Sequence, residues 1–90
     1  MLQIEVEARN LDEVQEALDC GVNVIMLDNM GTDEMKKACG LVNGRAKTEA
    51  SGNVTLENIR SVAETGVDII SLGALTHSVT AFDISMKWGK

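Results

Sequence analysis

Two stretches of the sequence repeat one another: LDEVQEALDCGVNVIMLDN at residues 11–29 and LENIRSVAETGVDIISLGA at residues 56–74. A shift of 45 residues aligns them and matches their apolar positions, the glycine within each and the predicted caps before them. The matched pairs are Leu11 with Leu56, Val14 with Ile59, Gly21 with Gly66, Val22 with Val67, Ile25 with Ile70, Leu27 with Leu72, and Asn10 with Thr55. A repeat of this length that holds two strands and two helices is one quarter of an eightfold α/β barrel.

Short apolar runs alternate with amphipathic helical stretches along the chain. The predicted helices begin at the caps Asn10, Thr32 and Thr55 and end at Gly21, Gly44 and Gly66. The inner face of the third helix is predicted to hold Leu56, Ile59, Val62 and Ala63. The predicted strands are Gln3–Ala8, Val22–Leu27, Arg45–Ala50, Val67–Leu72 and, after a short helical turn near Thr76–Thr80, Phe82–Trp88. This alternation predicts an α/β fold with right-handed βαβ units and a parallel sheet.

The chain has 90 residues, whereas a complete α/β barrel needs roughly 200 or more. Its two aromatic residues, Phe82 and Trp88, are few for a small domain that stands alone. We therefore expect residues 1–90 to form a single segment, half of a TIM-like barrel, made of two quarter-barrel repeats and a last strand at 82–88. A doubly wound, flavodoxin-like sheet and a solenoid are the alternatives that the repeat leaves open.

The composition excludes several classes of partner. A net charge of −6 argues against nucleic acid and anionic membrane surfaces. No apolar run approaches the roughly 20 residues of a membrane span, and the N-terminus lacks the pattern of a signal peptide. Cys20 and Cys39 are isolated thiols, which is typical of a reduced, cytoplasmic protein, although a redox pair is the alternative. A single histidine and the absence of a CxxC spacing argue against zinc.

In α/β barrels the active site lies at the carboxyl ends of the strands. The shift of 45 residues relates Glu7 to Gly52 and Asp28 to Gly73, so the first repeat places carboxylates where the second places glycines. Paired carboxylates suit Mg²⁺, sugar hydroxyls or a developing positive charge. Glu7 and Asp28 could equally be solvated charges, and Asp28 with the following asparagine could be a plain turn.

The glycines predict an anion site. Ser51-Gly52-Asn53 leads from a strand toward the helix expected near Thr55, whose N–H groups would face a bound phosphate, and Gly73-Ala74 ends the next strand. The alternative is ordinary turn chemistry. Glu49 either orders this loop or lies on the surface. His77 is either catalytic or a polar residue at the barrel mouth.

The strings EVEARNLDEVQEALDCGVNVIMLDN, EASGNVTLENIRSVAETGVDIISLGALTHS and AFDISMKW together resemble the C-terminal part of quinolinate phosphoribosyltransferase, also called nicotinate-nucleotide pyrophosphorylase (carboxylating). The resemblance covers nearly the whole chain and places it in the C-terminal half of the barrel. It implies a glycosyltransferase of NAD biosynthesis that converts quinolinate and phosphoribosyl pyrophosphate, with Mg²⁺, to nicotinate mononucleotide, pyrophosphate and CO₂.

The resemblance also implies roles for particular residues. Glu7 and Asp28 correspond to the acidic residues at the ribose and Mg²⁺ end of the donor, and the phosphate loops fall on Ser51, Gly52, Asn53, Gly73 and Ala74. Many members have glycine where this chain has Asn53, which leaves the geometry of that amide open. The basic residues that hold quinolinate lie upstream in the family, so the isolated 90-residue chain is expected to be inactive. It should associate with itself or with the missing half-barrel. The alternatives are a non-catalytic, truncated or engineered half-barrel that at most binds phosphate, and another phosphate-binding barrel.

Overall fold

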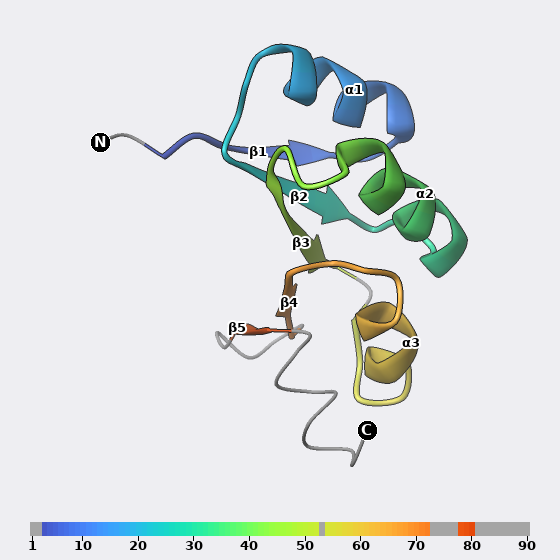
Figure 1. Ribbon diagram of the computed structural model, residues 1–90. Helices are drawn as coiled ribbons and strands as arrows, with labels where there is room; N and C mark the ends of the chain where they lie inside the picture. The colour runs from blue at the N-terminus through green and yellow to red at the C-terminus, as the bar shows by residue number, and fades with distance from the viewer. Residues whose placement is uncertain (1–2, 53, 73–77, 81–90) are drawn as a thin grey trace.

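The structure is a computed structural model that describes residues 3–52, 54–72 and 78–80. Three helices lie along one side of a five-stranded sheet (Figure 1). The strands are β1 (Glu5–Ala8), β2 (Val24–Asp28), β3 (Lys47–Ser51), β4 (Ile69–Ser71) and β5 (Ser78–Thr80). The helices are α1 (Leu11–Asp19), α2 (Thr32–Val42) and α3 (Ile59–Ala63). The predicted α/β class is thus confirmed.

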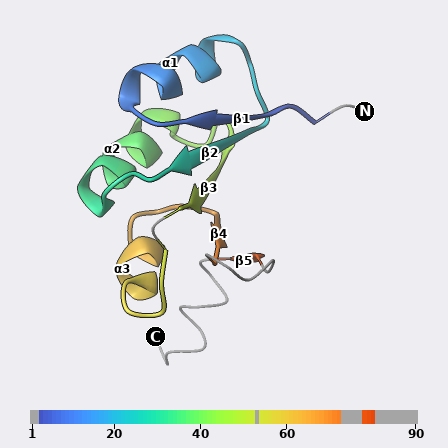
Figure 2. The same cartoon turned by 180° about the vertical axis from the view of Figure 1, so that it is seen from behind.

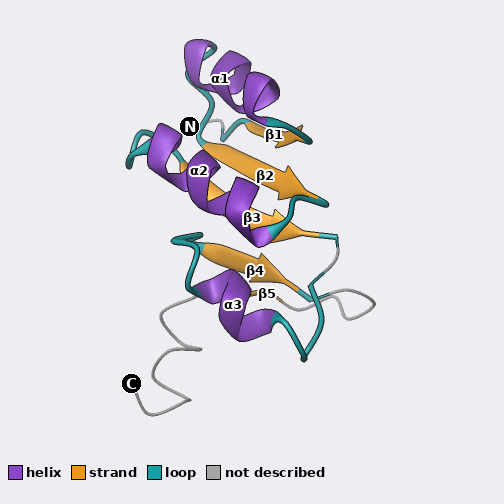
Figure 3. Ribbon diagram, turned by 90° about the vertical axis from the view of Figure 1, so that its right-hand side faces the viewer, coloured by secondary structure: helices purple, strands orange, loops and turns teal. Residues whose placement is uncertain are grey.

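The sheet has the order β1-β2-β3-β4-β5, so every strand pairs with its neighbour in the sequence. The first four strands are parallel and point the same way (Figure 3). Because right-handed crossovers between sequential neighbours all fall on one face, α1, α2 and α3 share that face, as the reverse view also shows (Figure 2). This is the arrangement of half a TIM-like barrel, with helices outside and the other face of the sheet inside.

Side chains alternate between the two faces of each strand. The alternate positions that pack under the helices are buried, and the fully buried ones include Ala8, Ile25, Leu27, Ala50 and Ile70. Their neighbours point to the face without helices, which we call the open face. The core is therefore confined to the layer between sheet and helices, and the open face is free to carry polar groups.

The first helix begins as predicted. The Asn10 side chain accepts a hydrogen bond from the Glu13 backbone N–H at 2.9 Å, and a Glu13 carboxylate oxygen accepts from the Arg9 N–H at 2.7 Å. This reciprocal pair is a variant of the capping box, in which Glu13 accepts from the N–H of Arg9, the residue before the N-cap, and it satisfies two N–H groups at the helix start. The helix ends at Asp19 with Cys20 as its C-cap, and Gly21 follows at the predicted C′ position with a φ of +72°, which favours glycine.

Two predicted caps are wrong. Gly31, not Thr32, is the N-cap of α2, and Thr32 is the first helical residue. In the second repeat α3 begins at Ile59 after the cap Asn58, and the Asn58 side chain accepts a hydrogen bond from the Thr55 N–H at 2.8 Å. This bond closes a turn over residues 55–58 in place of the expected first helical turn.

The exposure of Leu56 is a consequence of that shorter helix. It was predicted on the inner face of α3, but it is 79% exposed, whereas its counterpart Leu11 packs against the core. The repeat holds at the fully buried Ile25 and Ile70 and at the positive φ of Gly21 and Gly66. It fails at the helix start, where cap chemistry rather than apolar spacing sets the boundary.

The remaining differences concern helix and strand ends. Asn43, with a φ of +47°, is the C-cap of α2, and Gly44 follows it rather than ending the helix itself. The residues Ser78–Thr80, predicted in a helical turn, form β5, which runs antiparallel to β4. The proposed last strand at 82–88 and His77 lie outside the described residues.

Candidate functional site

The carboxyl ends of β1, β2 and β3 bring the predicted acidic residues onto the open face. Pairing of Glu7 with Met26 places Asp28 two residues further along the neighbouring strand, on the same face as Glu7. Asp28 in turn pairs with Ser51 at the end of β3. The register therefore places Glu7, Asp28 and Ser51 on one face, near the carboxyl ends of three neighbouring strands, which we call the acidic corner.

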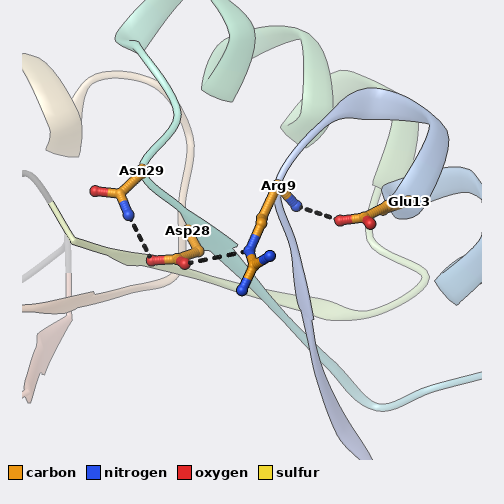
Figure 4. Close-up of polar contacts among 4 residues, drawn as sticks. All are labelled: Arg9, Glu13, Asp28 and Asn29. Atoms are coloured by element: carbon orange, nitrogen blue, oxygen red, sulfur yellow. Dashed lines mark hydrogen bonds and ion pairs between the residues drawn. The ribbon is translucent and has the colours of Figure 1, made fainter.

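The Asp28 side chain is 21% exposed and contacts Asn29 and Arg9 (Figure 4). One carboxylate oxygen accepts a hydrogen bond from the Asn29 amide at 3.3 Å. The other lies 3.8 Å from Nε of Arg9, whose side chain is 73% exposed. Asp28 thus keeps a fixed carboxylate with one direct partner on each oxygen and an open approach from water.

Asn29 couples Asp28 to the glycine turn on β3. Its φ is +56°, its backbone N–H donates to the Ser51 carbonyl at 3.0 Å, and its amide oxygen fills the place that a Cβ of Gly52 would need. Gly52 itself has a φ of +98°, which side chains rarely adopt. Only glycine therefore fits this position, and its backbone is open to a ligand on the exposed side.

The structure describes only part of the predicted phosphate-binding loops. Ser51 is half-buried and Gly52 is exposed, whereas Asn53, Gly73 and Ala74 lie outside the described residues. Because α3 begins at Ile59, the expected helix N-terminus near Thr55 does not face this turn, which corrects the prediction. The donors present near Gly52 are its own backbone and the Ser51 hydroxyl.

Glu49 lies on the open face, in the same row as Glu7 and Met26. Its carboxylate accepts a hydrogen bond from the Ser71 hydroxyl across the neighbouring strand. Of the two alternatives for Glu49, ordering of the loop or a place on the surface, this bond favours the first. It links β3 to β4 just before the Ser51–Gly52 turn.

The open face is acidic toward its strand ends. Alternation places Glu5, Glu7, Asp28 and Glu49 there, against the cations Arg9 and Lys47. Lys47 is the first residue of β3, at the amino end of the sheet, whereas Arg9 follows the carboxyl end of β1. Arg9 is therefore the cation that accompanies the acidic corner.

Both cysteines are free, and neither lies at this corner. Cys20 is exposed after α1. Cys39 is part of α2, and its sulfur lies 3.9 Å from the Thr48 hydroxyl on β3. Burial raises the pKa of the Cys39 thiol, and the nearby Asp68 carboxylate raises it further, while hydrogen bonds from Thr48 and Thr65 oppose the shift. These groups hold the amino-end half of the sheet together.

A hollow of about 270 Å³ lies beside β1, which is the edge strand of the sheet. It is bordered by Val6, Glu7, Glu13, Glu16, Ala17, Cys20 and Val22. Within the described residues no helix is long and apolar enough to cross a membrane.

Comparison with known proteins now identifies the chain. Residues 1–87 match the family described as the C-terminal domain of quinolinate phosphoribosyl transferase. The chain belongs to the quinolinate phosphoribosyltransferase family. The resemblance inferred from the sequence motifs is thereby confirmed.

Relatives of known name span several lineages. A probable carboxylating nicotinate-nucleotide pyrophosphorylase of Synechocystis sp. is 52% identical over 89 residues, covering 96% of this chain and 30% of the relative. A mitochondrial decarboxylating quinolinate phosphoribosyltransferase of Nicotiana tabacum is 48% identical over 99 residues, covering 93% and 28%. A chloroplastic nicotinate-nucleotide pyrophosphorylase of Arabidopsis thaliana is 46% identical over 101 residues, covering 96% and 29%. The chain thus spans less than a third of these relatives, and the cytoplasmic assignment stays a prediction.

Solved structures agree with the fold. The nicotinate-nucleotide pyrophosphorylase of Ehrlichia chaffeensis superposes with a TM-score of 0.77 at 46% identity, over 82% of this chain and 27% of that one. The enzyme of the same name from Francisella tularensis gives 0.76 at 37% identity, over 86% and 28%. The half-barrel architecture is therefore shared with this phosphoribosyltransferase family.

The residue types at the acidic corner suit the Mg²⁺ that the family implies. The described residues hold no cluster of three or more His, Cys, Asp or Glu side chains able to bind a metal. Mg²⁺ usually retains several waters and takes one or two carboxylates together with substrate phosphates. Glu7 and Asp28 supply such a pair of carboxylates, on one face of neighbouring strands.

Two residues at this corner were not singled out from the sequence. Asn29 was treated as a possible turn residue, which its left-handed backbone confirms, but its contact with Gly52 depends on the pairing of β2 with β3. Arg9 was not considered, because nothing in the local pattern relates it to Asp28, nineteen positions later. The signal that could have found it is the register: Ala8 pairs with Leu27, so Arg9 must follow opposite Asp28.

Proposed function

We propose that this chain carries the phosphoribosyl-donor half of a quinolinate phosphoribosyltransferase site. Quinolinate and phosphoribosyl pyrophosphate are the proposed substrates, and nicotinate mononucleotide, pyrophosphate and CO₂ the products, as a step of NAD biosynthesis. The observation that carries the proposal is the placement of Glu7 and Asp28 beside the Ser51–Gly52 turn, on the open face of a half-barrel that belongs to this family.

The proposed chemistry begins with departure of pyrophosphate from C1 of the ribose. Bond breaking leaves positive charge on the sugar ring, which the fixed carboxylates of Glu7 and Asp28 would stabilise. The pyridine nitrogen of quinolinate then forms the new bond to C1, and the adjacent carboxylate leaves as CO₂ while a proton replaces it on the ring. When bound, Mg²⁺ at Glu7 and Asp28 would neutralise the charge of the leaving pyrophosphate.

The second part of the proposal concerns binding of the donor's 5′-phosphate. The Gly52 backbone and the Ser51 hydroxyl are the proposed donors, together with Asn53, Gly73 and Ala74. Binding energy gained at this remote phosphate would orient C1 toward the carboxylates. The close contact between Gly52 and Asn29 supports this role, since it connects the Ser51–Gly52 turn to the residue next to Asp28.

The pyridine half of the site would come from elsewhere. We infer that the chain acts as one segment, the C-terminal half of the barrel, and that the isolated chain does not turn over quinolinate. The position of β1 at the edge of the described sheet supports association with a second half-barrel, either the missing half or another copy.

A transplant tests the proposed function. This chain would replace the matched segment of the Synechocystis relative, and formation of nicotinate mononucleotide would be measured. We expect an active enzyme, with activity lost in Asp28→Asn and retained in Glu5→Gln, a carboxylate on the same face at the amino end of β1. A folded but inactive transplant would contradict the proposal and favour a non-catalytic half-barrel.

A further inference from the structure

Arg9 is the feature of the acidic corner that the proposed function leaves unused. Its backbone is fixed, because its N–H donates to Glu13 in the capping box of α1. Its side chain extends over the end of β1 to Asp28, where Figure 4 shows the guanidinium beside the carboxylate. Arg9 thus has a fixed backbone and a long cationic side chain that reaches Asp28.

The contact between Arg9 and Asp28 is loose. The Nε–Oδ2 distance of 3.8 Å exceeds hydrogen-bond length, and the paired, two-bond arrangement of strong Arg–carboxylate contacts is not formed. At 73% exposure most of the guanidinium N–H groups face water. An exposed pair of this kind contributes little to stability, so the fold does not require Arg9 to stay at Asp28.

Asp28, by contrast, is held by Asn29 as well as by Arg9. If a cation engages Asp28, Arg9 loses its counter-charge while its backbone stays bound to Glu13 at the same corner. A guanidinium released in this way is well matched to phosphate oxygens, which it can bind through two parallel hydrogen bonds.

The order of groups along the strand ends determines which anion Arg9 would meet. Asp28 lies between Arg9 on the β1 side and Ser51 on the β3 side. A ligand with its sugar at Asp28 and one phosphate at the Ser51–Gly52 turn therefore directs a second anionic group toward Arg9. Phosphoribosyl pyrophosphate has this form, with a phosphate at one end of the ribose and a pyrophosphate at the other.

We propose that Arg9, whose backbone is held by Glu13, binds the pyrophosphate end of the donor. The inference rests on the proposed function. Arg9 is then a ligand-binding residue that discriminates the pyrophosphorylated sugar from the sugar phosphate alone.

The test compares two probes on the 90-residue chain in the presence of Mg²⁺: phosphoribosyl pyrophosphate and ribose 5-phosphate. Arg9→Gln should weaken binding of phosphoribosyl pyrophosphate by about tenfold or more and change that of ribose 5-phosphate by less than about twofold. Arg9→Lys should fall between, because it keeps the charge and loses the planar fork. Lys47→Gln, the same charge change at the amino end of the open face, should alter neither.

The outcomes separate the two claims. If the unaltered chain binds both probes and Arg9→Gln weakens both equally or neither, the role of Arg9 is overturned while the proposed function stands. If the folded, unaltered chain binds neither probe, the proposed function fails and the role of Arg9 fails with it. Circular dichroism of each variant distinguishes loss of binding from loss of fold.

Discussion

The two βαβ units that contain the repeats, residues 5–28 and 47–71, share buried strand positions and end their strands in different chemistry. Ile25 and Ile70 occupy equivalent, fully buried places under the helices. At the strand ends the first repeat presents Glu7, while the second presents Gly52 at the equivalent position with a φ of +98°. The core positions tolerate repetition because they only fill space, whereas the strand ends diverge at the place where we propose that the ligand binds.

The helix starts show the same contrast at the level of stability. The first repeat has a reciprocal pair of capping hydrogen bonds and a nine-residue helix, and the second has a closed turn followed by a helix of five residues. The shorter helix leaves a longer loop between Gly52 and Ile59, on the side where the phosphate is proposed to bind. We infer that the second repeat exchanges one turn of helix for a loop at the site.

The largest effect is expected at the acidic residue of the first repeat. Asp28→Asn removes the negative charge but keeps the shape, and should lower kcat/KM of the transplanted enzyme by about a hundredfold or more. The measurement is steady-state formation of nicotinate mononucleotide. Glu5→Gln is the matched control, and an equal loss in both variants would mean that net charge, not position, matters.

The glycine of the second repeat comes next. Gly52→Ala forces a side chain into left-handed backbone and into the Asn29 amide, so we expect weaker binding of phosphoribosyl pyrophosphate and a stability loss of about 1–3 kcal/mol. Gly44→Ala imposes similar strain at a φ of +81° with nothing within 4 Å, and should lower stability alone. Calorimetric titration and chemical denaturation of both variants separate the two effects, and equal binding would contradict a role for Gly52.

The matched leucines test whether the repeats are equivalent at the helix start. Leu11→Ala should lower the unfolding free energy by about 1–2 kcal/mol, because Leu11 packs on the core. Leu56→Ala should change it by less than about 0.5 kcal/mol, because Leu56 is mostly in water. Denaturation in urea measures both, and a large cost at Leu56 would show that another chain or segment covers it.

The matched caps give a smaller difference. Asn10→Ala removes the hydrogen bond to the Glu13 N–H and should cost about 1 kcal/mol. Thr55→Ala should cost less, since Thr55 contributes its backbone rather than its side chain to the turn. Unfolding free energies in urea compare the two, and equal losses would restore the predicted cap at Thr55.

The smallest effect concerns pH. The pKa of Cys39 is raised in the folded protein, so its contribution to stability is complete below the ordinary cysteine pKa of 9.0 and is lost as pH rises through the higher folded value. The unfolding free energy should therefore fall less steeply above pH 9 in Cys39→Ala than in the unaltered chain. Cys20→Ala, at an exposed site, is the control and should follow the unaltered chain.

The sequence predicted the fold well where burial alone decides it. The spacing of Val14, Ile25 and Ile70 located the helices and strands to within a few residues, because apolar residues on one face of an element are buried in the core. It failed at Thr32, where the glycine before it is the cap, and at Thr55, where a turn closed by Asn58 replaces the first turn of the helix. It also missed β5, whose antiparallel pairing has no counterpart in the repeat.

Of the candidate site, the sequence indicated which described residues lie at the strand ends but not their contacts. The repeat related Glu7 to Gly52, and the parallel register then brought Asp28 and Ser51 side by side. The contacts of Arg9 with Asp28 and of Asn29 with Gly52 join residues about twenty positions apart. Such contacts follow only from the strand register, which the sequence pattern alone does not fix to one residue.

The most direct test of the donor half-site is calorimetric titration of phosphoribosyl pyrophosphate with Mg²⁺ into the purified 90-residue chain, beside light scattering for its mass. The account predicts binding that is lost in Asp28→Asn and in Gly52→Ala and kept in Glu5→Gln. A folded chain that binds no phosphoribosyl pyrophosphate, or binds it equally well in Asp28→Asn, would contradict the account.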